Sequence, residues 1–188
     1  MSTSSVGRPG RYQRSAGGLV AALVITVVVV GGLLWVLGLF RADLEVGPEQ
    51  VDYLGIAGEA QDAGLEPVYP ESLPDGWEAT AYDVSAVDAP VLELRMLTDD
   101  EEFAAVHQES ATASSLVREY VDEDASPTVI YSTDGSVVGA WQGYEDEGGD
   151  TAYAAEVDGQ SVLVYGSASP AELQDLIGRL TTDAVDGG

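Results

Sequence analysis

An uninterrupted apolar segment near the N-terminus constrains this chain more than any other feature. Residues 16–40 read AGGLVAALVITVVVVGGLLWVLGLF, with no charge and only Thr26 as a polar side chain. A helix of roughly 20 such residues crosses the ~30 Å hydrocarbon core of a membrane, whereas a soluble helix is usually apolar on one face only. The segment therefore predicts one transmembrane helix ahead of the rest of the chain.

The residues that flank this segment predict its orientation. Arg8, Arg11 and Arg14 precede it, whereas Arg41 alone follows it closely, and Trp35 lies near its outer end, where indole rings prefer the membrane interface. The segment is longer than the ~7–15 apolar residues of a cleaved signal peptide, and no small-x-small cleavage site follows it. We therefore expect an uncleaved signal anchor in the plasma membrane, with the N-terminus in the cytoplasm and the C-terminal part outside.

Small side chains recur within the predicted anchor at a spacing of four residues. Gly18, Ala22 and Thr26 would lie on one face of the helix, and such a face lets two membrane helices approach closely. One hypothesis is a homodimer formed through this face. The alternative is that these residues reflect only the frequent use of Gly and Ala in membrane helices.

The charge of the remaining chain excludes one broad class of function. The protein has 33 Asp and Glu against 7 Arg and Lys, and every acid follows the predicted anchor. Such a domain repels nucleic acid and anionic headgroups, which are bound through clustered positive charge. The absence of Cys also excludes disulfides, thiolate zinc sites and thiol catalysis.

Composition and periodicity divide the chain into five parts. The first is Ser-, Gly- and Arg-rich, as in disordered tails, and the fourth is long enough for one compact domain. We expect a cytoplasmic tail at 1–15, the anchor at 16–40, an extracytoplasmic stalk at 41–66, an extracytoplasmic domain at 67–182 and a tail at 183–188. A helix within the stalk is expected to begin at Pro48 and end at Gly64; it would either extend the stalk or pack on the domain.

Alternating apolar residues and turn signals predict the fold class of the domain. The order of three strands, a helix, four strands and a helix is typical of an α+β domain, with a largely antiparallel sheet and two or three helices on one face. Asp-Gly pairs between apolar runs indicate hairpins, and Ser169, Pro170 and Glu172 form a helix-capping box. The strands are expected at 77–84, 91–97, 103–108, 128–132, 137–144, 151–157 and 161–165, and the helices at 113–121 and from 169 onward.

Several short motifs, in this order, resemble one known family. Residues 70–77 read PESLPDGW, residues 106–110 read VHQES, residues 139–144 read GAWQGY, and a Ser-x-x-Glu-Leu helix begins at Ser169. Together with the basic tail and single membrane helix, this layout resembles the DUF4245 family of actinobacterial membrane proteins. The resemblance implies a membrane location and a function that is unknown, and it carries over no catalytic residues.

No residue pattern in the chain predicts catalysis or a bound cofactor. His107 is the one histidine, no Gly-x-Ser-x-Gly elbow is present, and we expect His107 on a strand, partly exposed beside acidic residues. Acid clusters at 99–102, 122–124 and 145–150 do not have the spacing of a calcium loop, so we interpret them as charged turns. We expect no metal site and no cofactor.

Large aromatic residues leave two interpretations open for the domain. Trp77, Trp141 and Tyr144 are either core and turn anchors or part of a recognition surface. The leading hypothesis is a membrane-anchored extracytoplasmic binding or assembly module of the cell envelope, with the lipid bilayer and other envelope proteins as partners. The alternative is an envelope hydrolase that uses carboxylates.

Overall fold

A computed structural model describes residues 50–85 and 89–185 of the chain. The chain divides into two units, Met1–Gly47 and Pro48–Gly188, and every described residue lies in the second. Among these residues, no helix is both long and apolar enough to span a membrane. The predicted anchor and its candidate residues lie outside the described part: Arg8, Arg11, Arg14, Gly18, Ala22, Thr26, Trp35 and Arg41.

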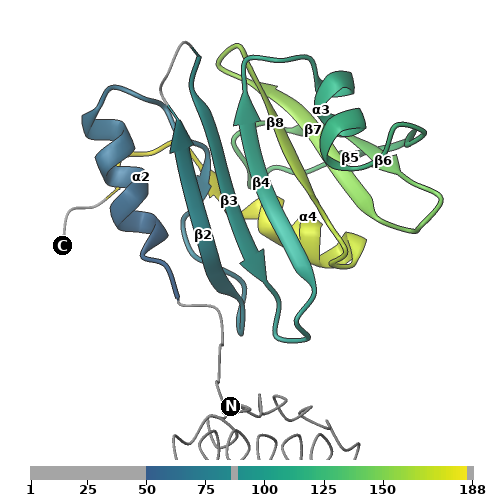
Figure 1. The fold of residues 1–188 in the computed structure, drawn as a ribbon, viewed down its shortest axis with the longest axis horizontal. Helices are drawn as coiled ribbons and strands as arrows, with labels where there is room; N and C mark the ends of the chain where they lie inside the picture. The colour runs from purple at the N-terminus through teal and green to yellow at the C-terminus, as the bar shows by residue number, and fades with distance from the viewer. Residues whose placement is uncertain (1–49, 86–88, 186–188) are drawn as a thin grey trace, which may run out of the picture. The chain divides into compact units, whose positions relative to one another are not determined.

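A seven-stranded antiparallel sheet forms the body of the described domain, in the order β2-β3-β4-β8-β7-β6-β5 (Figure 1). Strands β2 to β4 form one meander and β5 to β8 form another, and the two meet where β4 pairs with β8. The expected α+β class with a largely antiparallel sheet is confirmed. The strands are β2 Glu78–Ser85, β3 Val91–Leu97, β4 Phe103–Glu109, β5 Ser126–Ser132, β6 Ala140–Glu145, β7 Thr151–Val157 and β8 Gln160–Gly166.

Helices cover both faces of this sheet, so the expectation that they share one face is wrong. Helices α2 and α4 contribute to the larger apolar cluster on one face, and α3 packs on the other face against β7 and β8. The second face accepts a helix because β7 presents the small side chains of Ala152 and Ala154 beneath Leu116 and Val117 of α3. The helices are α2 Tyr53–Asp62, α3 Ala113–Tyr120 and α4 Pro170–Gly178.

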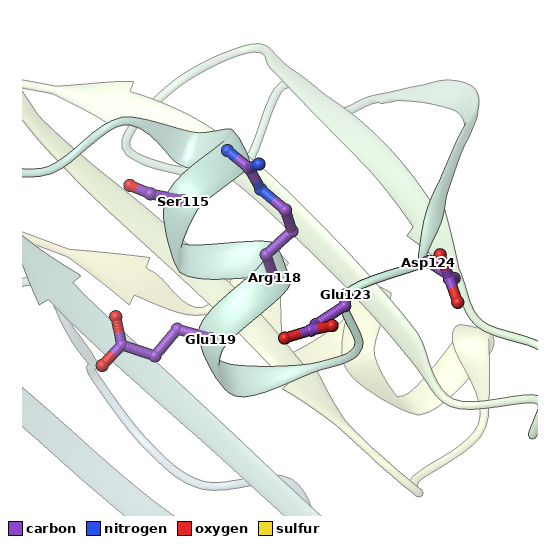
Figure 2. A pocket seen from close by; sticks show the side chains of 5 residues that line it. All are labelled: Ser115, Arg118, Glu119, Glu123 and Asp124. Carbon is purple, nitrogen blue, oxygen red and sulfur yellow. The ribbon is translucent and has the colours of Figure 1, made fainter.

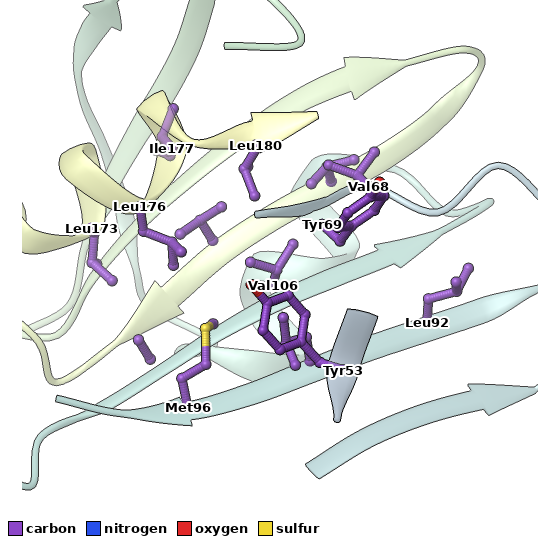
Figure 3. Close-up of a cluster of buried hydrophobic side chains, with 14 of the residues drawn as sticks. Tyr53, Val68, Tyr69, Leu92, Met96, Val106, Leu173, Leu176, Ile177 and Leu180 are labelled. Carbon is purple, nitrogen blue, oxygen red and sulfur yellow. The ribbon is translucent and has the colours of Figure 1, made fainter. Parts of the chain in front are cut away.

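The larger core joins segments from both ends of the domain (Figure 3). Tyr53 of α2, Met96 of β3 and Leu176 of α4 all lie in it, each at most 8% exposed. A small second sheet pairs β1, Tyr69–Pro70, with β9, Leu180–Thr181. Because α2 buries Tyr53 in the same core, the helix of the expected stalk packs on the domain.

Local hydrogen bonds explain where the helices begin. The Ser169 hydroxyl accepts the Glu172 N–H while the Glu172 carboxylate accepts the Ser169 N–H, so the predicted capping box is present. The Thr112 hydroxyl caps α3 by accepting the Ser115 N–H at 3.3 Å. Helix α2 begins at Tyr53 and not at Pro48, because the Asp52 carboxylate accepts the Gly55 N–H at 3.1 Å and forms the N-cap.

The glutamine of the VHQES motif ties β4 to the chain that follows α2. The Gln108 carbonyl oxygen accepts the Val68 N–H at 2.7 Å. Its amide nitrogen donates to the Glu66 carbonyl at 2.9 Å and to the Gln160 side chain at 2.6 Å. Gln108 is 2% exposed, so these bonds satisfy polar groups that burial would otherwise leave unpaired.

Candidate functional site

Strand β5 forms one edge of the sheet and carries the most exposed large apolar side chains of the described residues. Val129 is 82% exposed and Ile130 is 62% exposed, and the next is Val84 on the opposite edge strand, at 38%. Two adjacent, exposed aliphatic side chains on an edge strand are unusual, because edges are normally protected by charge, proline or covering segments.

A β-bulge sets the conformation of this strand. Thr128 and Val129 of β5 lie together opposite Gly143 of β6, between regular pairs on either side. A Cβ atom on Gly143 would lie 2.7 Å from the Val129 carbonyl oxygen and 2.5 Å from the Thr128 hydroxyl. The bulge can approach β6 this closely only because Gly143 has no side chain.

The side chain of Gln142 stabilises the bulge through two hydrogen bonds. Its amide nitrogen donates to the Thr128 carbonyl at 2.8 Å and to the Gly143 carbonyl at 3.0 Å. Gln142 and Gly143 belong to the GAWQGY motif. Trp141 of the same motif is fully buried on the other face of the sheet. The motif thus builds the bulge that projects Val129 from the domain.

Beyond the bulge, no other strand of the described residues pairs with the outer edge of β5. The Thr133 N–H donates to the Gly139 carbonyl at 3.1 Å, and Ile130, Tyr131 and Ser132 pair in regular register with β6. Because backbone groups alternate between the two sides of a strand, the N–H and C=O groups of Ile130 and Ser132 point away from β6. They can receive a further strand.

The opposite edge of the sheet, at β2, is covered in part by other segments. The Val51 N–H donates to the Ala79 carbonyl of β2 at 2.9 Å, and α2 packs against β2. A bulge between Ala79 and Ala81 also interrupts the ladder of β2. Of the two edges, β5 is the one that carries the two most exposed large apolar side chains of the described residues.

Two hollows lie at helix α3; the larger is drawn in Figure 2, and the smaller reaches β5. The larger has a volume of about 580 Å³ and is lined by Ser115, Glu119 and Asp124 together with Arg118 and Glu123. The smaller, of about 360 Å³, shares Arg118 and Glu123 and extends to β5 and β6; it is completed by Ser114, Val117, Ala125, Pro127, Gln142 and Tyr144.

The structure separates the three aromatic residues considered as a recognition surface. Trp77 is 7% exposed and Trp141 is fully buried, so both are core residues and offer no face to a ligand. Tyr144 is half-buried, pairs with Pro127 of β5 and lines the smaller hollow. Only Tyr144 of these three lies where a partner could touch it.

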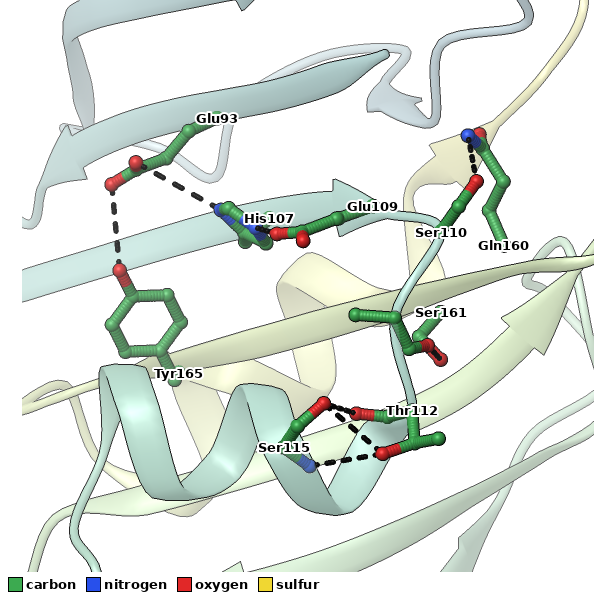
Figure 4. A network of polar contacts seen from close by, with 10 residues as sticks. Glu93, His107, Glu109, Ser110, Thr112, Ser115, Gln160, Ser161 and Tyr165 are labelled. Carbon is green, nitrogen blue, oxygen red and sulfur yellow. Dashed lines mark hydrogen bonds and ion pairs between the residues drawn. The ribbon is translucent and has the colours of Figure 1, made fainter. Parts of the chain in front are cut away.

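A polar network lies beside α3 around the single histidine (Figure 4). The His107 side chain is fully buried on β4. Its Nε2 lies 3.0 Å from a carboxylate oxygen of Glu109, and its Nδ1 lies 3.8 Å from one of Glu93. The centre of the Tyr120 ring lies 4.1 Å from the centre of the His107 ring, and the two rings are tilted by 36°. The Tyr165 hydroxyl donates to Glu93 at 3.4 Å. The expectation of a partly exposed histidine is wrong, because Tyr120 of α3 covers the ring.

This network orders the sheet beneath α3. Burial, and next the nearby Glu93, raise the pKa of Tyr165, so its hydroxyl remains a donor. Burial and the neighbouring carboxylates, Glu119 first, likewise raise the pKa of Tyr120. Because the His107 ring has no exposed surface, we assign it a structural role in joining β3 and β4 to α3.

Sequence reasoning predicted a strand near β5 but missed its edge position and its exposed residues. Val129 and Ile130 are apolar, which by itself predicts burial. Pro127 was the available signal, because proline within a strand favours an edge.

Taken together, these features define an α+β domain whose antiparallel sheet has helices on both faces and whose bulged edge strand β5 exposes two aliphatic side chains. The family model for DUF4245, described as a protein of unknown function, matches residues 11–180, so the chain belongs to the DUF4245 family. The chain matched none of the curated proteins with which it was compared.

Proposed function

We propose that this protein is a membrane-anchored binding or assembly module of the cell envelope. The apolar run at 16–40 would hold it in the bilayer, and the three Arg ahead of the run would keep the N-terminus in the cytoplasm. The domain would then lie outside and engage other envelope proteins. The face of Gly18, Ala22 and Thr26 is a proposed contact between two copies within the membrane.

The exposed pair Val129 and Ile130, on the open edge of β5, is the observation that carries this proposal. Strand addition to an open edge is a common way to bind a protein segment, because backbone hydrogen bonds supply affinity and adjacent side chains supply specificity. The bulge beside it has a dedicated glycine and glutamine, as expected of a feature that aims a side chain toward a partner.

Site-directed photo-crosslinking in the native membrane tests this proposal. A benzophenone amino acid replaces Val129 in the full-length protein, and a second version carries it at Val84, the exposed residue of the opposite edge strand β2, as the matched control. We expect a discrete adduct from position 129 that position 84 does not give, and mass spectrometry then locates the crosslink in a defined segment of the partner. The same adducts from both positions would contradict binding at β5.

Recovery of the protein without any adduct would direct attention to the hydrolase alternative. Its location would be the larger hollow, where Glu119, Glu123 and Asp124 surround Arg118. Substitution of Glu123 by Gln, assayed against envelope polymers, would then separate a catalytic carboxylate from an acidic surface residue.

A further inference from the structure

We propose that the open edge of β5 receives an extended segment of a partner protein whose apolar centre is flanked by Lys or Arg. The inference rests on the proposed binding function and specifies the chemistry of the partner. The first observation that supports it is the edge strand itself, where Ile130 and Ser132 present outward backbone groups beside the exposed side chain of Val129.

The apolar centre of the segment follows from the side chains on the edge. Pairing with β5 would bring partner side chains against Ile130, which shares a face with Gln142, and alternate partner residues would lie on either face of the sheet. Covering Val129 and Ile130 removes apolar surface from water, which favours binding. A partner segment with Val, Ile or Thr at alternating positions fits this surface.

The flanking positive charges follow from the acids at both ends of β5. Asp122, Glu123 and Asp124 are exposed just before the strand, Glu145 is exposed opposite Ser126, and a further exposed acid, Asp134, follows the strand. Arg118 lines the hollows at α3, and Arg179, which forms an ion pair with Asp175 at 3.1 Å, lines a further hollow that includes Tyr131 of β5. The net field at both ends is therefore negative, and it favours a cationic segment and opposes an acidic one.

The same charges disfavour a second copy of this domain as the occupant. Antiparallel pairing of two copies through residues 130–132 would place Asp134 of each copy opposite Thr128 of the other and would bring together two strands that are both flanked by acids. Juxtaposed surfaces of like charge oppose association. The bulge and Pro127 also prevent pairing along the first half of the strand, so two copies could share only a short ladder.

Synthetic peptides test the inference on the full-length protein in nanodiscs of zwitterionic phosphatidylcholine. The first peptide alternates Val and Thr with two Lys at each end, and the second replaces each Lys by Glu. We expect the Lys peptide to bind at least about tenfold more tightly at low salt, with the difference shrinking as ionic strength rises. Equal binding, or tighter binding of the Glu peptide, would overturn the inference.

Two controls separate strand addition from attraction to the acidic surface at large. N-methylation of alternate residues in the Lys peptide keeps its charge but removes N–H donors, and we expect about a tenfold loss of binding. Replacing Ile130 by Pro removes the outward N–H of the protein and should have a similar effect, whereas Val84→Pro, on the opposite edge strand β2, should not. Unchanged binding of the N-methylated peptide would assign the affinity to charge alone and overturn the inference.

The crosslinking experiment distinguishes failure of this inference from failure of the proposed function. An adduct from Val129 to a partner segment without basic residues would overturn the cationic chemistry while supporting a binding role. An adduct within a short extended segment flanked by Lys or Arg would support both.

Discussion

Gly166 at the end of β8 shows how one residue without a side chain sets the geometry of the sheet centre. Its φ is +150°, and a Cβ atom there would collide with the carbonyl oxygen of Phe103. The same oxygen accepts the Ala168 N–H at 3.0 Å. The chain therefore lies very close to the backbone at the start of β4 where it turns toward α4.

We expect Gly166→Ala to lower the free energy of unfolding by more than about 2 kcal/mol, because both backbone strain and a steric clash arise. Gly159→Ala is the matched control: its φ is +81°, but no atom lies within 4 Å of the added Cβ, so its effect should stay near about 1 kcal/mol. Urea unfolding followed by tryptophan fluorescence measures both. Equal losses would show that the contact with Phe103 is relieved at little cost.

Buried tyrosines make the domain sensitive to alkaline pH. Burial, and next the neighbouring Tyr69, raise the pKa of Tyr82 above its usual value of 10.0, and burial and Glu93 do the same for Tyr165. Above pH 10 the unfolded chain releases protons that the folded domain retains. Stability is therefore fully present below this pH and falls above it, by about 1.4 kcal/mol per pH unit for each such tyrosine.

We expect Tyr82→Phe to flatten this alkaline decline while changing stability at pH 7 little, because the Tyr82 hydroxyl is buried without a hydrogen-bond partner in the described structure. Urea midpoints at pH 8, 10 and 11 provide the measurement. A variant that declines as steeply as the parent would assign the alkaline loss to other groups.

At the scale of single elements, the bulge of β5 depends on the neighbouring strand. We expect Gly143→Ala to displace Thr128 and Val129 from β6, with an overpacking cost of about 1–3 kcal/mol. Hydrogen exchange should then rise at the β5 amides but not at those of β8, and crosslinking from position 129 should fall several-fold.

Gly135→Ala provides the control for this substitution, because its added Cβ would meet its nearest atom at an ordinary 3.6 Å. It should leave both the exchange pattern and the crosslink unchanged. If Gly143→Ala behaved in the same way, the bulge would not depend on the missing side chain.

At the scale of the whole molecule, the proposed topology is directly testable because the chain has no Cys. Single cysteines introduced as Ser5→Cys in the N-terminal tail and as Ser85→Cys at an exposed position of β2 would each report one side of the membrane. We expect a membrane-impermeant maleimide to label Ser85→Cys in intact cells and Ser5→Cys only after permeabilisation. The reverse pattern would contradict the orientation derived from the Arg residues.

Local signals in the sequence were sufficient for much of the secondary structure. The expected strands at 91–97 and 151–157 coincide with β3 and β7, and the capping box of α4 is present. The Asp158-Gly159 turn also forms, with positive φ at both residues. These features depend on neighbours a few residues apart, through side-chain alternation, capping hydrogen bonds and the backbone freedom of glycine.

What the sequence by itself determined is the α+β class and the strands and caps that short-range interactions specify. Only the tertiary structure decided that α3 covers a second face of the sheet, that His107 and Trp141 are buried, and that β5 is an open edge with Val129 and Ile130 exposed. Apolar side chains have the same local pattern in a central strand as in an edge strand. Their burial depends on which distant segments pack beside them, and alternation along one strand carries no information about those neighbours.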